Sequence, residues 1–260
     1  IGLLDDIQDM PNHYDYSIQF YDRYYRPENS IVVVVGDFDQ SVLERLSEQY
    51  YSDWERGDFV PRIPQEPKQF EERTTTVGWS NPTLPFLMIG YHVPAFSDAA
   101  IDMPALDVFS QLLFSETSPL FRQLYLEEQL VDVIQGSALD SRDAPLFSII
   151  ARVTDAARIH DVRDAIYEEI ERLKTEPVDT AILDSTKSHM RYGFAMGLNS
   201  PGQIARTLSH YLQLTEDPQT VNRVYDLYES VSPDDIMMVA NTYFSNSNRT
   251  VVVLTAEEGQ

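Results

Sequence analysis

The sequence contains no cysteine. This absence excludes disulfide bonds, thiolate zinc sites and cysteine nucleophiles from the chain. It leaves the redox compartment open, because a chain without thiols is compatible with both oxidising and reducing surroundings.

Positive charge is scarce. The chain has 19 Lys and Arg against 42 Asp and Glu, a net charge of −23, and only three of its cations are lysines. Nucleic-acid binding needs a basic patch that neutralises phosphates, so we expect no nucleic-acid partner. The excess of acid indicates mainly a solvated surface, as in a protein from salty surroundings. Steering of cationic peptides is the alternative.

Long hydrophobic runs are also missing. No window approaches the run of about 20 apolar residues that a membrane helix needs, so we expect no membrane segment in this chain. The start, Ile1-Gly2-Leu3-Leu4, has no basic flank and no cleavage site of small residues, and no secretory signal is visible. The chain has no initiator methionine, and we interpret it as a segment of a longer protein.

The motifs of common catalytic sites are absent from the sequence. A zinc helix needs closely spaced histidines, and no two of the histidines lie within 20 residues of each other (His13, His92, His160, His189 and His210). Neither a G-x-S-x-G elbow nor a glycine-rich phosphate loop occurs. We therefore predict no catalytic residue and no metal ligand in this chain.

The first part of the chain predicts a helix, a strand and a second helix. Residues 14–25 have an aromatic helical face, and the β-branched run Ile31–Val35 is typical of a strand buried on both faces. Asp39 is suited to cap the following helix, which we place up to residue 53. Residues 57–70 hold three prolines and are predicted to be a linker.

The second part predicts an α+β domain in which helices are segregated from strands. The strands, two of them in a hairpin, are expected at 72–78, 85–92, 131–139, 146–154 and 250–255. The helices are expected at 98–114, 119–128, 159–173, 178–197, 201–214, 218–230 and 233–244. The last helix has a strong start signal, with Ser232 as cap and Pro233 in the first position.

One helical segment carries a candidate for substrate binding. Arg191 and Tyr192 resemble a substrate clamp, although a packed tyrosine beside an exposed arginine is the favoured interpretation. Gly193 and Gly197 follow in the same helix, where glycine often marks close packing or a bend.

Three stretches, in order along the chain, resemble the pitrilysin and insulinase family of zinc metallopeptidases. The first is Ile1-Gly2 to Ile7 followed by FYDRYYRPENSIVVVVGDFD. The second is Pro94 with Asp102 to Leu106 and SPLFRQLYLEEQLVDVI. The third is VSPDDI with Ala240, Tyr243-Phe244 and the strand VVVL. The resemblance covers nearly the whole chain.

This resemblance implies a domain organisation. Two related α+β roll domains form one half of an enclosure around an unfolded peptide in that family, and an HxxEH helix plus a glutamate bind zinc in the first domain. Residues 1–56 then resemble the end of a first domain, 57–70 a linker, and 71–260 a complete, non-catalytic second domain. The resemblance implies zinc in the parent and none in this fragment, which we predict to be inactive alone. It implies as partners the zinc-bearing domain, a second homologous half and peptide substrates.

The family often holds its substrate with an arginine and a tyrosine seven positions apart. Alignment through Glu128-Gln129-Leu130 places Tyr125 and Asp132 at these positions, so the resemblance implies that the pair is absent. Arg122, one turn before Tyr125, is kept with it as a candidate contact to substrate.

The resemblance leaves other functions open. Some relatives are structural or assembly subunits without proteolytic activity, which is the main alternative, and an unrelated α+β binding module is a third. Similar proteins suggest a bacterial periplasm or envelope as the location.

Overall fold

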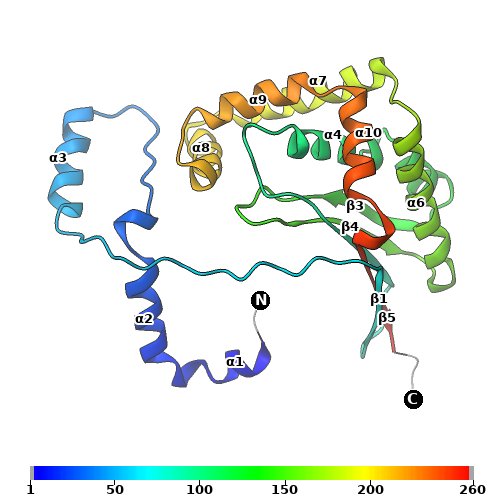
Figure 1. Cartoon of the computed structure of the whole chain (residues 1–260), viewed down its shortest axis with the longest axis horizontal. Helices are drawn as coiled ribbons and strands as arrows, with labels where there is room; N and C mark the ends of the chain where they lie inside the picture. Colours follow the sequence, from blue (N-terminus) through cyan, green and yellow to red (C-terminus); the bar gives the residue numbers. More distant parts are fainter. Residues whose placement is uncertain (1–2, 258–260) are drawn as a thin grey trace.

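The computed structural model describes residues 3–257, which form an open N-terminal region and a packed α+β region (Figure 1). The N-terminal region contains α1 (Leu4–Gln8), η1 (Met10–Asn12), α2 (Tyr14–Tyr24), η2 (Pro27–Asn29) and α3 (Gln40–Tyr51). The Asp39 carboxylate accepts hydrogen bonds from the backbone of Ser41 and Val42, as its predicted capping role requires. No residue from 3 to 84 is buried.

The predicted buried strand at Ile31–Val35 is wrong for this chain. The segment has no regular secondary structure, and Val32 is 64% exposed. A β-branched run becomes a buried strand only when neighbouring strands satisfy its backbone groups and cover its side chains. No such neighbour lies beside it among residues 3–257.

The packed region is built on one mixed sheet with the strand order β1-β5-β2-β4-β3. Its strands are β1 (Arg73–Trp79), β2 (Phe86–His92), β3 (Val131–Ser137), β4 (Leu146–Val153) and β5 (Arg249–Ala256). The predicted β3–β4 hairpin is confirmed, and every pair is antiparallel except β1 with β5. The last strand lies inside the sheet, so β1 and β3 are its edges.

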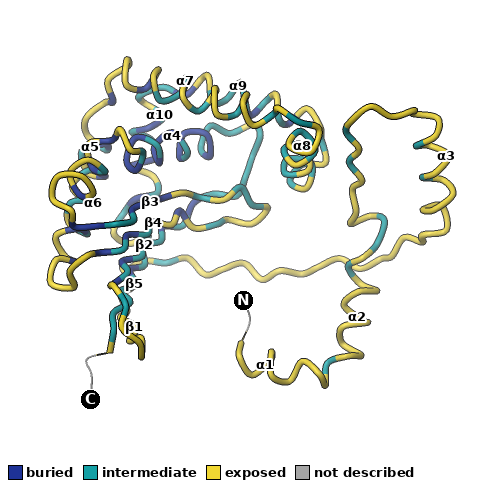
Figure 2. The backbone as a smooth tube through the Cα atoms, turned by 180° about the vertical axis from the view of Figure 1, so that it is seen from behind, coloured by how far each residue is buried: buried dark blue, intermediate teal, exposed yellow. Residues whose placement is uncertain are grey.

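The longer helices of this region lie on one face of the sheet (Figures 1 and 2). They are α4 (Asp102–Phe114), α6 (Ile159–Thr175), α7 (Thr180–Gly197), α8 (Pro201–Thr215), α9 (Thr220–Ser230) and α10 (Pro233–Tyr243). Short turns complete the chain: α5 (Pro119–Phe121), η3 (Arg122–Glu127), η4 (Ala156–Arg158) and η5 (Asn246–Asn248). The predicted α+β class, with helices segregated from the sheet, is confirmed.

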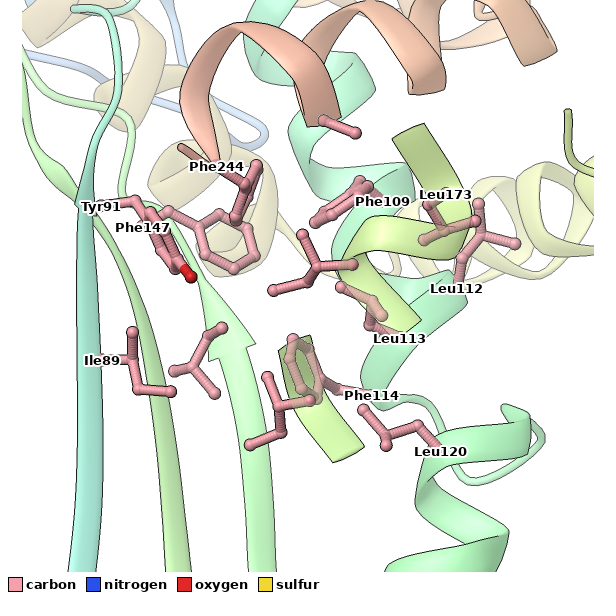
Figure 3. Packing of buried hydrophobic residues seen from close by; sticks show 14 of the residues in the cluster. Ile89, Tyr91, Phe109, Leu112, Leu113, Phe114, Leu120, Phe147, Leu173 and Phe244 are labelled. Atoms are coloured by element: carbon pink, nitrogen blue, oxygen red, sulfur yellow. The ribbon is translucent and has the colours of Figure 1, made fainter. Parts of the chain in front are cut away.

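The core lies between this helical layer and the sheet. The alternation predicted for β4 is confirmed, because Phe147, Ile149, Ala151 and Val153 are each 1% exposed or less. Phe244 joins three rings at its centre, with centroids 4.5 Å from Phe109, 4.8 Å from Tyr91 and 5.0 Å from Phe147 (Figure 3). Such tilted aromatic contacts add to the burial of apolar area.

No helix of residues 3–257 lies over the opposite face of the sheet (Figure 2). Strand register places one row of side chains across this face, in the order Val133, Arg152, Phe86, Leu254 and Val77. Four of these five side chains are apolar. A largely apolar, uncovered row across all five strands marks a surface suited to contact with other polypeptide.

Candidate functional site

The first candidate surface is the β3 edge of the open sheet face. A β-bulge between Val131 and Val133 inserts Asp132 beside Arg152 of β4. The Arg152 guanidinium donates to both carboxylate oxygens of Asp132, at 2.7 and 2.8 Å. It also lies 5.9 Å from the centre of the Phe86 ring. Bulges often redirect a side chain in this way, and here the bulge aims Asp132 at a cation.

This ion pair determines the charge state of Asp132. The hydrogen bonds from the Arg152 guanidinium lower the pKa of the Asp132 carboxyl below its ordinary value. The same bonds raise the pKa of Arg152. Both side chains are more than a third exposed, so solvent weakens the pair, and it orders the bulge more than it stabilises the fold. At this position, Asp132 is an ionised and already paired carboxylate.

The other candidates at this end, Arg122 and Tyr125, lie on η3, a π-helical turn just before β3. The Tyr125 ring is 40% exposed and stacks on Phe121 with centroids 4.8 Å apart. Arg122 is exposed as well, and among the described residues no hydrogen bond or ion pair holds its guanidinium. The turn thus presents one aromatic ring and one free cation to solvent. Whether they bind substrate remains a prediction.

A polar groove of about 540 Å³ adjoins the β3 edge. Edge strand β3 contributes Gln135 and Gly136 to its wall, α4 contributes Ser110 and Phe114, and α7 contributes His189. Because β3 pairs only with β4 among the described strands, its outer edge has backbone groups without a strand partner, except that the Gly136 carbonyl accepts a hydrogen bond from the Ser110 hydroxyl.

The second candidate surface lies on α7. Arg191 is adjacent to Tyr192, with the guanidinium carbon 5.8 Å from the ring centre. The interpretation of Tyr192 as a packed residue is wrong, because it is 65% exposed and its ring projects away from the core. Gly193 and Gly197 do not mark close packing, since a Cβ at either position would meet nothing within 4 Å.

A cavity of about 170 Å³ lies between α7, α8 and α9, and Arg191 forms part of its wall. Its wall is mostly apolar and aromatic, with three charged side chains. The lining residues are Lys187, Met190, Arg191, Phe194, Tyr211, Val221, Val224, Tyr225, Tyr228 and Glu229. The structure therefore separates the sequence-predicted candidates into two places, the η3 turn and α7.

Sequence reasoning missed a buried acid next to this cavity. The Tyr228 hydroxyl donates a hydrogen bond to Asp107 of α4. Burial raises the pKa of Asp107 to about 6, the Tyr228 bond opposes this effect, and the charge of Asp140 adds to it. Asp140 in turn lies 3.1 Å from His210 Nε2. The sequence offered one signal of this buried acid, because Asp107 is the single acid in the otherwise apolar stretch Ala105 to Phe109.

No group of three or more His, Cys, Asp or Glu within residues 3–257 is arranged to hold a metal ion. His210 pairs with Asp140 and His13 with Asp9, so these two histidines bond to separate carboxylates far apart in the sequence. The described histidines and acids therefore do not fit a zinc site. No helix of the described chain is both long and apolar enough to cross a bilayer.

A sheet covered by helices on one face and open on the other defines an α+β roll domain, the class expected from the resemblance. The chain belongs to the peptidase M16 family, and residues 14–190 match the domain described as "Peptidase M16 inactive domain". It is a non-catalytic domain of a family of zinc proteases. The predicted relationship to pitrilysin-type and insulinase-type peptidases is thereby confirmed.

Individual relatives agree with this assignment. The zinc protease PqqE of Helicobacter pylori is 30% identical over 259 residues, which cover 98% of this chain and 57% of that protein. The crystal structure of a protease from Helicobacter pylori has a TM-score of 0.86 at 28% identity, over 98% of this chain and 61% of that one. A putative M16-like peptidase from Alicyclobacillus acidocaldarius shares the fold, with a TM-score of 0.78 at 17% identity over 94% and 58%. The chain spans less than two thirds of each of these proteins.

Proposed function

We propose that this chain forms a non-catalytic wall of a zinc-peptidase chamber and helps to hold an extended peptide. The observation that carries the proposal is the open sheet face, whose row from Val133 to Val77 is largely apolar and lacks helical cover. In a closed chamber such a face excludes water and contacts an unfolded substrate without demanding a particular sequence. Membership of an inactive peptidase domain family supports this role.

The β3 edge supplies a second, more specific contact. An extended peptide can add to an unpaired strand edge through main-chain hydrogen bonds, while its side chains enter adjacent pockets. The groove beside Gln135 and Gly136 offers such pockets. Tyr125 and the paired Asp132 stand where the resemblance places the substrate-holding arginine and tyrosine, so we assign this chain no direct role in the cleavage step.

The metal and the catalytic base are assigned to a different domain of the parent protein. When bound there, zinc would supply an activated water for hydrolysis. Residues 1–56 fit the end of that first domain, since Ile31–Val35 has the composition of a central strand but no neighbour in the described chain. Exposed apolar residues of the same segment, such as Tyr14 and Tyr50 at 71% each, would be covered by the rest of that domain. A second homologous half would close the chamber.

A complementation assay tests the proposal. The 260-residue chain is mixed with a protein carrying the zinc-bearing domain, and cleavage of a quenched fluorescent peptide is followed with and without a zinc chelator. We expect no cleavage by the chain alone and chelator-sensitive cleavage by the mixture. Met88→Glu, which places a charge in the middle of the open face, should reduce cleavage, while Ser209→Ala on α8 should not.

Two results would contradict the proposal. Chelator-sensitive cleavage by the chain alone would show that it carries its own metal site. A mixture that assembles but never cleaves any peptide would favour the alternative, a structural or assembly subunit.

A further inference from the structure

The cavity between α7, α8 and α9 has the size and wall of a site for one apolar group. Four rings contribute to it, from Phe194, Tyr211, Tyr225 and Tyr228. Its volume is about 170 Å³. An apolar cavity of roughly 150 Å³ stays dry and accepts benzene, so this one has room for a phenyl ring or a branched aliphatic side chain.

The cations at the rim of the cavity differ in their freedom to bind a ligand. The Lys187 ammonium donates to the carbonyls of Glu229 and Val231, both at 2.9 Å, and so closes the end of α9. The Arg191 guanidinium is 3.6 Å from the Glu229 carboxylate, too far for a hydrogen bond. Within the described chain it donates no hydrogen bond, and its side chain is 43% exposed. The Arg191 guanidinium therefore has N–H groups without a hydrogen-bond acceptor, next to a largely apolar cavity.

We propose that this cavity binds the C-terminal residue of a peptide, with its aromatic or branched side chain among the four rings and its carboxylate on Arg191. An arginine suits this task because its planar guanidinium binds both oxygens of a carboxylate at once. The choice of a peptide as ligand rests on the proposed function. The cavity and the unbonded donors of Arg191 do not depend on that choice.

The net charge of −23 does not prevent such a contact. Charges more than about 8 Å away are largely screened at physiological ionic strength, so the side chains at the rim decide the local attraction. Glu229 is the nearest competing carboxylate, and a ligand that pairs closely with Arg191 would displace its loose contact at 3.6 Å.

Two small probes of nearly equal shape test the proposal on the full 260-residue chain. N-acetyl-phenylalanine has the ring, a peptide group and a free carboxylate, whereas N-acetyl-phenylalaninamide has the same ring and peptide group with an uncharged amide in place of the carboxylate. Each is titrated while backbone amide signals of α7 and α9 are followed by NMR. We expect the acid to shift these signals and to bind about tenfold more tightly than the amide, the size of effect typical of one charge-assisted contact. Equal binding of the two probes, or no shift on these helices, would overturn the proposal.

Three variants locate the contact. Arg191→Gln should abolish the preference for the acid, and Val221→Phe should fill the cavity and weaken both probes at least tenfold. Met196→Ala, which changes an exposed side chain on the same helix outside the cavity wall, should leave both affinities unchanged. If Val221→Phe does not fold, Val221→Leu fills part of the same space. Unchanged probe binding in a folded cavity-filling variant would refute the site.

A third probe distinguishes a peptide end from a free acid. 3-Phenylpropionate has the ring and the carboxylate but no peptide group. Binding weaker than that of N-acetyl-phenylalanine supports the peptide assignment, and equal or tighter binding overturns it. These titrations need no partner domain, so a failed complementation assay would leave them valid, and a failed titration would leave the chamber role untouched.

Discussion

Asp107 is the residue whose surroundings most directly couple this fold to pH. It projects from α4 into the space beneath α9, where it accepts the Tyr228 hydroxyl bond, and Asp140 is the other charged group acting on it. Burial raises its pKa to about 6 from an ordinary value of 3.8. The folded state therefore holds this proton more tightly than the unfolded state does.

Replacement of Asp107 by asparagine tests this linkage. Because the folded pKa is raised, the stability that protonated Asp107 contributes is complete below about pH 4, falls as pH rises, and is lost above about pH 6. The full change is roughly 3 kcal/mol at 1.36 kcal/mol per pKa unit. Urea unfolding at pH 4.5 and pH 7 should show Asp107→Asn losing less stability than the wild type over this interval. Parallel losses in both proteins would contradict the assignment, and Tyr228→Phe serves as the control that keeps the acid.

Replacement by alanine should change the stability of the protein in opposite directions at two glycines. A Cβ on Gly136 would lie 2.4 Å from a ring carbon of Phe114, which is held in the core, whereas a Cβ on Gly193 would meet nothing within 4 Å. We expect Gly136→Ala to destabilise the protein by about 1–3 kcal/mol through overpacking. Gly193→Ala should stabilise it by about 0.5–1 kcal/mol, because alanine favours the helix. Chemical denaturation of the pair measures both, and equal signs would refute the packing at Gly136.

At the scale of an element, α10 begins with a complete capping box. The backbone of Asp235 donates to the Ser232 hydroxyl, and the Asp235 carboxylate accepts from the Ser232 backbone at 2.9 Å. This helix packs Ile236, Val239 and Ala240 into the core with none of their surface exposed. The cap therefore anchors an element on which the core depends.

Loss of this cap should reduce the free energy of unfolding. Ser232→Ala should lower the free energy of unfolding by about 1 kcal/mol, as is typical for capping hydroxyls. Ser209→Ala, in an exposed position within α8, is the matched control and should change stability by less than about 0.5 kcal/mol. The measurement is thermal or urea unfolding of both variants, and a cost at Ser209 equal to that at Ser232 would mean that the cap is not responsible.

Strands and helices of the packed region were predictable because their patterns are local. Alternation in β4 and the Ser232-Pro233 start of α10 specify burial and helix entry from neighbouring residues alone. Ile31–Val35 could not be predicted in the same way, since a strand exists only where other strands meet it. The candidate site was even harder to predict, because nothing in the sequence indicates that Asp132 pairs with Arg152 across a bulge.

At the scale of the whole molecule, the two regions contribute unequally to stability. Residues 3 to 84 bury no side chain, and the contacts of the linker with the sheet include hydrogen bonds from Gln69 to Arg249 and from Thr250 to Gln69. The buried core lies wholly within residues 87–251. The predicted division into 1–56, 57–70 and 71–260 leads to a direct test.

A fragment of residues 68–260, which retains Gln69, should fold by itself. Because the removed part buries no side chain, we expect its melting temperature to lie within about 4 °C of that of the full chain, a shift worth no more than roughly 1–2 kcal/mol for a domain of this size. Differential scanning calorimetry of both proteins decides the matter. An unfolded fragment, or two separate transitions in the full chain, would contradict a single stable domain.

The amino-acid sequence was sufficient to establish the absence of thiol chemistry, the lack of a spaced metal motif, the α+β class and the residues that face the core. These follow from composition and from periodicity within short segments. Packing of the folded chain was needed to reveal that Asp107 bonds to Tyr228, 121 residues away, and that Asp132 bonds to Arg152, 20 residues away. It also formed the cavity that α7, α8 and α9 line. Such contacts depend on how distant segments pack, which no local pattern specifies.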